Sequence, residues 1–283
     1  MSIDPSSVQT TDQSTDQTTD QNGDLAAAAA PTGAAPQAAI AQHLVKTYGT
    51  GQATVHALRD VSVGFDRGQF TAIMGPSGSG KSTLMHCLAG LDVATSGRVL
   101  IGETDLSKLK DAAMTKLRRD RIGFVFQSFN LVPTLTAKEN ITLPLDIAGK
   151  AVDQEWFTMV TERLGLTDRL SHRPSELSGG QVQRVACARA LVGKPEIIFG
   201  DEPTGNLDSK SSAEVLSILR ASVDDFGQTV VIVTHDPRAA SYADRVVFLA
   251  DGRIVSDQRG LSADDIYEYM KHLDGGAGQT EER

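Results

Sequence analysis

One eight-residue stretch constrains this chain more than any other part of its sequence. It consists of Gly75, Pro76, Ser77, Gly78, Ser79, Gly80, Lys81 and Ser82, and it fits the pattern of a glycine, four residues and then Gly-Lys-Ser. The apolar run at 70–74 predicts a short buried strand before it, and residues 83–89 predict a helix after it. A strand, a glycine-rich loop and a helix in this order predict a loop that binds phosphate groups.

The residue types of this loop suit a polyphosphate. Glycine lets the backbone curl where a Cβ atom would collide, and the N–H groups of the loop and of the helix N-terminus then point at the anion. We expect Lys81 to contact the β- and γ-phosphates, Ser82 to bind Mg²⁺ and Thr83 to complete the nucleotide site. The alternative, an accidental Gly/Ser-rich turn, is disfavoured because both flanking elements are in place.

Composition sets outer limits on the function. A length of 283 residues allows one or two domains. The net charge is −9, of which the Asp residues in 1–45 supply −5 and the remaining chain only −4. No basic stripe of the kind that nucleic-acid binders need is present, so we expect no nucleic-acid partner. Cys87 and Cys187 each fall in a predicted helix and are interpreted as small buried residues rather than a disulfide or metal site.

The two ends of the chain are predicted to lie outside the folded domain at 40–273. Residues 1–39 are rich in Thr, Asp, Gln, Ala and Pro, which predicts a disordered tail, either inert or a tether or partner-binding arm. Residues 274–283 predict a flexible C-terminus. No apolar run of about 18 residues and no signal peptide is recognisable. We therefore expect a cytosolic protein, or one held at a membrane by something else.

Two strand-like stretches, 40–48 and 55–65, predict an antiparallel sheet that leads to the phosphate loop. Tyr48 ends the first of them, near the rim of the sheet. An exposed aromatic ring there could stack on an adenine base, since every base has a π-face. A packing tyrosine is the alternative, and spacing alone leaves both open.

An apolar loop follows the predicted strand at 122–126 and Gln127. The loop at 128–136 carries four large apolar residues, although loops are normally polar. It is interpreted as a docking surface, with a loop folded under its own domain as the alternative. Predicted helices at 138–148 and 153–164 make residues 130–180 a small helical insert between strands of the main sheet.

Three further polar groups stand where elements begin or end. Leu177 and the following Ser178, Gly179, Gly180 and Gln181 precede a predicted helix at 182–192, and taken alone they are a capped helix start. Asp201 and Glu202 end an apolar strand, where Asp201 can hold Mg²⁺ and Glu202 can lie beside the attacking water. His235 follows another apolar strand and is a candidate γ-phosphate contact, although an isolated histidine is more often structural.

Taken together, these motifs resemble the ATP-binding subunit of ABC transporters over roughly residues 40–257. The Leu-Ser-Gly-Gly-Gln pentapeptide at 177–181, between a phosphate loop and an Asp-Glu strand, is the most specific part of the resemblance. The resemblance implies an α/β P-loop NTPase with a RecA-like mixed or parallel sheet core. An N-terminal antiparallel β subdomain and a small inserted α-helical subdomain would complete it.

The resemblance also assigns roles. Tyr48 matches the aromatic residue that stacks on adenine, and residues 75–82 match the Walker A loop. Gln127 matches the glutamine that senses Mg²⁺ and the attacking water, and the loop at 129–136 is similar to the groove that receives a coupling helix. The remaining matches are Ser178 to Gln181 for the signature that caps the γ-phosphate of the opposite subunit, Asp201 for the Walker B aspartate, Glu202 for the catalytic base, Asp208 for the D-loop aspartate and His235 for the switch histidine.

The sequence at 126–136 and 201–208 resembles that of the branch that includes macrolide exporters, lipoprotein-release ATPases and the bacterial cell-division ATPase. Membership implies ATP hydrolysis with Mg²⁺, an ATP-sandwich dimer of two copies, and a four-helix permease with an extracytoplasmic domain at the inner face of the plasma membrane. Val182 and Gly200 depart from the usual pattern, and neither is expected to touch phosphate.

Three rival functions also use a phosphate loop of this kind. A regulatory ATPase of a membrane complex that controls an extracytoplasmic enzyme would use the same cassette and is not separated from export by the sequence. Soluble repair or translation ATPases would need coiled-coil insertions or a second cassette, and neither is present. A P-loop kinase would leave the pentapeptide at 177–181 unexplained.

Overall fold

The computed structural model describes residues 36–128 and 130–277. Most of the predicted tail therefore lies outside the described residues, as does Phe129 of the predicted apolar loop. Strand β1 (Gln37–Tyr48) begins before residue 40, because Ala38 and Ala39 are buried in the core, and helix α8 (Ala263–Ala277) runs past residue 273.

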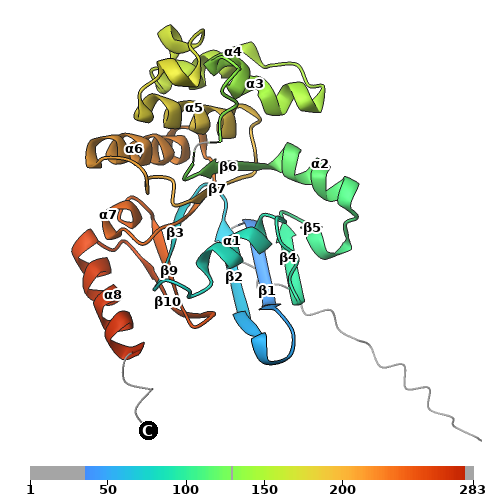
Figure 1. The fold of residues 1–283 in the computed structure, drawn as a ribbon, viewed down its shortest axis with the longest axis vertical. Helices are drawn as coiled ribbons and strands as arrows, with labels where there is room; N and C mark the ends of the chain where they lie inside the picture. Colours follow the sequence, from blue (N-terminus) through green and yellow to red (C-terminus); the bar gives the residue numbers. More distant parts are fainter. Residues whose placement is uncertain (1–35, 129, 278–283) are drawn as a thin grey trace, which may run out of the picture. The chain divides into compact units, whose positions relative to one another are not determined.

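A six-stranded mixed sheet forms the centre of the described chain (Figure 1). Its order is β10-β9-β3-β8-β7-β6, and every neighbouring pair is parallel except the β9–β10 hairpin. The strands are β3 (Phe70–Met74), β6 (Ile122–Phe126), β7 (Ile197–Asp201), β8 (Val230–Val233), β9 (Arg245–Ala250) and β10 (Arg253–Arg259). The predicted α/β class with a mixed sheet is confirmed.

Alternation along the central strands divides the core into two faces, because successive side chains of a strand point to opposite sides. On β8, Val230 and Ile232 pack with helices α5 (Gly179–Val192) and α6 (Ser209–Phe226), whereas Val231 and Val233 pack with α1 (Lys81–Leu88) on the other face. The same alternation recurs on β9. The helix that follows the phosphate loop and the helix that begins at Gly179 therefore lie on opposite faces of this sheet.

A second, antiparallel sheet has the order β2-β1-β4-β5, and it packs on the α1 side of the core. It contains β2 (Val55–Asp66), β4 (Ser96–Ile101) and β5 (Thr104–Asp105) beside β1. The predicted N-terminal antiparallel subdomain is confirmed. A glycine is required at position 97, because a Cβ atom there would lie 2.3 Å from the carbonyl oxygen of His43.

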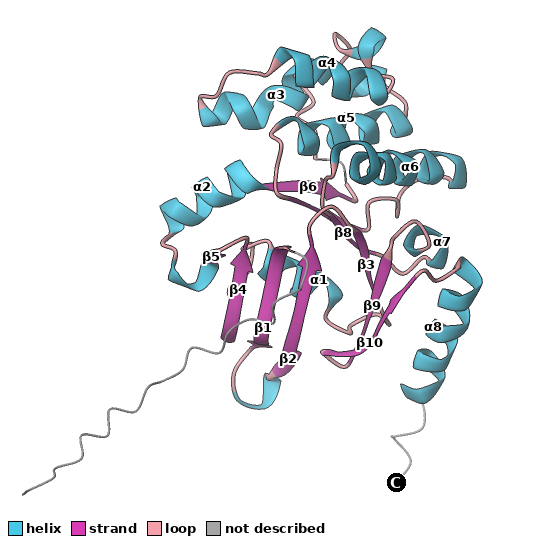
Figure 2. Ribbon diagram, turned by 180° about the vertical axis from the view of Figure 1, so that it is seen from behind, coloured by secondary structure: helices cyan, strands magenta, loops and turns pink. Residues whose placement is uncertain are grey.

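The predicted helical insert consists of α3 (Ala137–Ala148) and α4 (Gln154–Arg163), which lie beside α5 (Figure 2). Thr136 and Glu139 form a capping box at the start of α3, and Asp153 caps α4. Trp156, the only tryptophan in the sequence, joins this insert to the core. Its ring packs edge-on against Phe226 at 4.9 Å, and its Nε1 donates to the carbonyl oxygen of Leu191 at 3.1 Å.

The remaining elements are short or peripheral. They are α2 (Asp111–Arg121), α7 (Pro237–Ala240) and 3₁₀ helices at Gly51–Ala53, Leu106–Lys108, Thr167–Arg169 and Pro174–Glu176. Residues 106–108 and α2 are separate helices, because residues 109 and 110 leave helical geometry. Both cysteines are buried in helices and unbridged, as predicted. Burial raises the pKa of the Cys187 thiol to about 12, so it stays protonated.

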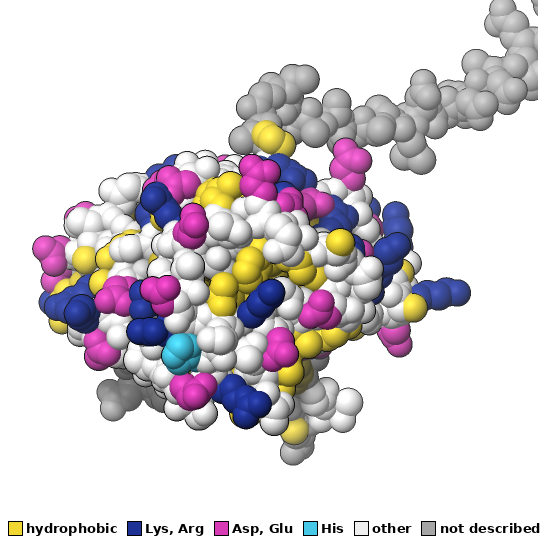
Figure 3. All heavy atoms as spheres, turned by 90° about the horizontal axis from the view of Figure 1, so that it is seen from above, with side chains coloured by type: hydrophobic (Ala, Val, Ile, Leu, Met, Phe, Trp, Pro, Cys, Tyr) yellow, Lys and Arg dark blue, Asp and Glu magenta, His cyan; other side chains and the backbone are white. Residues whose placement is uncertain are grey.

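The surface seen from the end that carries α3 and α4 mixes acidic and basic side chains (Figure 3). That face shows no continuous basic stripe of the kind that nucleic-acid binding needs. Among residues 36–128 and 130–277, no helix combines the length and hydropathy needed to cross a bilayer.

Candidate active site

The loop at 75–80 connects β3 to α1 and depends on its glycines. Gly75, Gly78 and Gly80 have φ angles of 147°, 78° and 100°, which residues with a Cβ atom rarely adopt. A Cβ atom at Gly75 would lie 1.9 Å from the carbonyl oxygen of Leu249, and one at Gly80 would lie 2.4 Å from that of Ala57. The loop can keep this shape only with glycine at these positions.

The same loop carries donors that suit a polyphosphate. The Lys81 ammonium donates to the carbonyl oxygens of Gly75 at 2.8 Å and Pro76 at 2.7 Å, so its stem arches over the loop. No side chain caps the N-terminus of α1, and the buried Ser79 hydroxyl has no hydrogen-bond partner within the described chain. Open N–H groups, an ammonium and an unmatched hydroxyl together form a cradle for an anion.

Two oxygen ligands of the kind that Mg²⁺ prefers meet beside this loop. The Ser82 hydroxyl on α1 donates to Asp201 Oδ1 at the end of β7, at 3.2 Å. Within residues 36–128 and 130–277, no cluster of three or more His, Cys, Asp or Glu side chains could hold a metal. The pair of Ser82 and Asp201 oxygens suits Mg²⁺, which takes one or two protein oxygens and completes its shell with water and substrate phosphates.

His86 is a neighbour of Asp201 that sequence analysis missed. Its Nε2 lies 3.6 Å from Asp201 Oδ2. Helical spacing could have revealed it, because His86 stands four residues after Ser82 and residues four apart share a helix face.

Glu202 and His235 lie together at the carboxyl ends of β7 and β8. His235 Nδ1 is 2.8 Å from Glu202 Oε1, and the Glu202 N–H donates to the carbonyl oxygen of Val233 at 3.0 Å. Glu202 has a φ of 49°, which is unusual for a residue with a side chain. Such strain persists only where the surroundings fix it, and it is common where a side chain must be aimed at a reacting group.

Gln127 and Asp208 both lie at the turn that follows β7. Gln127 Nε2 donates to Asn206 Oδ1 at 3.4 Å, and Asn206 Nδ2 donates to the Gln127 carbonyl oxygen at 3.2 Å, which joins the end of β6 to the turn after β7. Asp208 caps α6 by accepting from the N–H groups of Lys210 and Ser211, each at 3.0 Å. The hydrogen bonds from Ser211 lower the pKa of the Asp208 carboxyl.

Tyr48 stands at the end of β1 with 41% of its surface exposed. Its hydroxyl donates to Asp92 Oδ2 at 2.6 Å, and the Lys46 ammonium lies 4.6 Å from the centre of its ring. Burial and the hydrogen bond to Asp92 raise the pKa of Tyr48, and the neighbouring Thr83 opposes that rise. Thr83 lies on α1, so Tyr48 stands near the start of the helix that follows the phosphate loop. Asp92 and Lys46 were not expected from the sequence.

A further group of predicted site residues lies at the start of α5. It consists of Ser178, Gly179, Gly180 and Gln181 and is called the signature segment here. The Ser178 hydroxyl accepts from the Gln181 N–H at 3.3 Å, and Gln181 Oε1 accepts from the Ser178 N–H at 2.9 Å, so the two form a capping box at the start of α5. Because α5 and α1 cover opposite faces of the sheet, one chain does not bring this segment to its own phosphate loop.

Asn140 organises the loop after Gln127 and was also missed. It is fully buried on α3. Its Oδ1 accepts from the Val132 N–H at 2.7 Å, and its Nδ2 donates to the carbonyl oxygens of Leu135 at 3.1 Å and Thr136 at 3.0 Å. Val132 itself stays exposed, whereas Leu131 packs partly against the core. The loop is therefore held from its own domain and keeps an apolar residue outward.

A phosphate loop after β3, an Asp-Glu strand end and a histidine on the next strand, all on a mixed α/β sheet, define a P-loop nucleotide triphosphatase. Comparison with known proteins narrows the class: the profile of the ABC transporter family matches residues 58–205. The chain belongs to this family and is one of its ATP-binding proteins, an ATPase.

Three similar proteins illustrate the relationship. The uncharacterized ABC transporter ATP-binding protein YvrO of Bacillus subtilis is 46% identical, over 77% of this chain and 96% of YvrO. The macrolide export ATP-binding/permease protein MacB of Burkholderia thailandensis is 47% identical over 78% of this chain, which spans only 34% of that protein. The solved ATP-binding cassette MJ0796, a dimer bound to ADP and Pi, superposes with a TM-score of 0.70 at 40% identity, covering 79% of this chain and 99% of the cassette.

Proposed function

We propose that two copies of this chain enclose ATP between them and drive a membrane permease. One observation carries the first half of the proposal: the signature segment and the phosphate loop belong to opposite faces of one sheet. A second copy facing the first can place its signature segment over the nucleotide bound by the first. The dimeric form of the MJ0796 cassette supports such an arrangement.

Each residue of the site has a task in this proposal. The loop at 75–83 binds the phosphates, Tyr48 stacks on the base, and the signature segment and Asp208 approach the nucleotide of the opposite copy. Ser82, Asp201 and Gln127 would hold Mg²⁺, which supplies charge neutralisation on the β- and γ-phosphates when bound. Glu202 accepts a proton from the attacking water, and His235, 2.8 Å away, orients the Glu202 carboxylate.

Closure follows from differential affinity. ATP contacts both copies only in the closed dimer, so it shifts the equilibrium toward closure, and loss of the γ-phosphate removes that bias. The N-terminus of α5 is the positive end of the helix dipole, and it stabilises the charge of the γ-phosphate only in that closed state.

Mixed dimers test the sandwich. We expect dimers of Lys81→Ala alone and of Ser178→Arg alone to hydrolyse ATP at less than about a hundredth of the wild-type rate. Lys81→Ala removes an ammonium from both sites. Ser178→Arg removes the cap of α5 and puts a bulky side chain where the signature segment must approach the nucleotide. A dimer with one chain of each kind keeps one intact site, made of the unchanged loop and the unchanged signature segment. It should recover up to half of the wild-type rate, measured after purification through two different tags. No recovery in a stable mixed dimer would contradict the sandwich.

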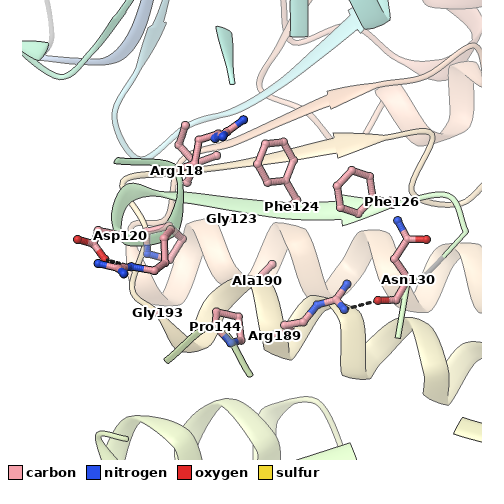
Figure 4. Close-up of a pocket in the computed structure, with 13 residues that line it drawn as sticks. Arg118, Asp120, Gly123, Phe124, Phe126, Asn130, Pro144, Arg189, Ala190 and Gly193 are labelled. Carbon is pink, nitrogen blue, oxygen red and sulfur yellow. Dashed lines mark hydrogen bonds and ion pairs between the residues drawn. The ribbon is translucent and has the colours of Figure 1, made fainter. Parts of the chain in front are cut away.

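The permease half of the proposal is supported by a cavity of about 350 Å³ beside β6, the edge strand of the larger sheet (Figure 4). The stacked rings of Phe124 and Phe126 line it, together with Arg118, Pro144 and Arg189. A segment docked there would contact the strand that ends next to Gln127. In this proposal the cavity receives a cytoplasmic segment of a four-helix permease, and that contact holds the chain at the inner face of the plasma membrane.

Gly193→Trp tests the cavity. Gly193 lines it, and a Cβ atom at this position meets nothing within 4 Å, so a large side chain can fill the cavity without disturbing the fold. We expect unchanged ATP hydrolysis by the purified chain, but at least an approximately tenfold loss of the chain recovered with membranes of its own cells, since well-packed contacts carry most interface energy. Gly193→Ala is the matched control and should behave as wild type. Normal membrane recovery of the Trp variant would exclude this cavity as the docking site.

A further inference from the structure

Gln183 connects α5, the helix that begins with the signature segment, to the residues directly after Glu202 in the same chain. It is fully buried on α5, two residues after the signature segment. Its Nε2 donates to the carbonyl oxygen of Pro203 at 2.7 Å. Its Oε1 has no hydrogen-bond partner within the described chain. A buried amide that is only half satisfied costs stability, so it calls for an explanation beyond packing.

The acceptor of this bond directly follows the proposed base, Glu202. The segment is fixed from three sides. The Glu202 N–H donates to Val233 on β8, the Gly205 N–H donates back to the Glu202 carbonyl oxygen at 3.0 Å, and Gln183 holds Pro203 from α5. Gly200 makes room for the proline ring, because a Cβ atom there would lie 3.3 Å from Pro203 Cγ. The unusual glycine before Asp201 therefore has a packing reason.

Of these three contacts, only the one from Gln183 comes from the helix that carries the signature segment. The other two lie within the larger sheet and the turn that leaves it. A shift of α5 relative to the sheet therefore acts on the Pro203 carbonyl group, and through it on the strained backbone of Glu202, whose φ is 49°.

We propose that Gln183 is a positioning residue that couples the two ATP sites of the sandwich. This inference rests on the dimer proposed above. The signature segment of one chain closes on the ATP held by its partner, and Gln183 carries that closure to Pro203 and Glu202 of the same chain. Each chain thus aims its own base in response to the nucleotide that the other chain has bound.

Two mixed dimers separate this coupling from a local effect on the signature segment. In both, Glu202→Gln disables one site. In the first dimer, Gln183→Leu is on the same chain as Glu202→Gln, so the active site uses an unchanged Glu202 and the altered chain's signature segment. In the second, the two changes are on different chains, so the active site uses the Glu202 that follows the altered Gln183.

The reference is a dimer with Glu202→Gln on one chain and no other change. We expect kcat of the first dimer to stay within about twofold of this reference. We expect kcat of the second to fall by about 10- to 100-fold, as it does when a catalytic group is slightly misplaced. KM for ATP should stay within about twofold in both, because Gln183 is fully buried and offers no surface to a bound nucleotide. Equal losses in the two dimers, or a larger loss in the first, would overturn the coupling.

Controls keep the outcome interpretable. Cys187 lies one turn further along α5 and is equally buried. Cys187→Ala in place of Gln183→Leu should therefore give the same kcat in both dimers. If Gln183→Leu lowers the melting temperature, Gln183→Met, which keeps an unbranched chain, replaces it under the same expectations. If Glu202→Gln chains do not dimerise on binding ATP, the sandwich itself is overturned. That result is distinct from equal losses of kcat in two mixed dimers that do form, which would overturn only the coupling.

Discussion

Replacing Glu202 with Gln is expected to lower kcat for ATP hydrolysis by about 10² to 10⁴-fold while ATP still binds. The amide keeps the shape of the side chain and can still contact His235, but it cannot accept a proton from water. Because hydrolysis is what reopens the proposed dimer, the variant should accumulate as an ATP-bound dimer. Size-exclusion chromatography with light scattering, with and without ATP and Mg²⁺, measures this directly.

Glu162→Gln is a suitable control for this variant, since Glu162 is an exposed carboxylate on α4, away from the nucleotide edge. It should retain wild-type turnover and should not accumulate as an ATP-bound dimer. Retention of normal turnover by Glu202→Gln would remove Glu202 from the role of base, whatever its distance from His235.

Lys81→Ala should instead weaken nucleotide binding, by about 10- to 100-fold in Kd, the range that corresponds to losing a charged hydrogen bond of about 1.5–3 kcal/mol. The ammonium already arches over the loop through the carbonyl groups of Gly75 and Pro76, so little rearrangement is needed for it to reach the phosphates. Titration with a fluorescent ATP analogue gives Kd, and turnover at saturating ATP separates binding from chemistry.

The exposed Lys138 on α3 provides the matched control, because Lys138→Ala removes a lysine without touching the loop. Its Kd should equal that of the wild type. If Lys81→Ala bound ATP as tightly as the wild type, the phosphate loop would not hold the triphosphate in the way described.

Local pattern was enough to predict the elements that carry the site. Strands β3, β7 and β8 are short apolar runs, of which β7 ends at Asp201 and β8 is followed by Thr234 and His235, and the loop between β3 and α1 has glycines at the positions where φ is positive. Such features are written within a few neighbouring residues, so a single sequence reveals them.

Contacts between distant segments could not be predicted in this way. Asp92 holds Tyr48 from a position 44 residues away, and Gln183 reaches Pro203 across 20 residues. The start of β1 was missed for a different reason. Its first residues, Ala38 and Ala39, continue an Ala/Pro-rich composition that is typical of disorder, and only their burial against the core shows that they belong to the sheet.

The position of Trp156 has a practical consequence. Its indole lies where the helical insert meets the core, between Phe226 and the Lys194 ammonium, which is 5.2 Å from the ring. Since the sequence contains no second tryptophan, fluorescence excited at wavelengths that only tryptophan absorbs reports on that joint alone. Relative movement of insert and sheet would thus be visible in real time, without a dye.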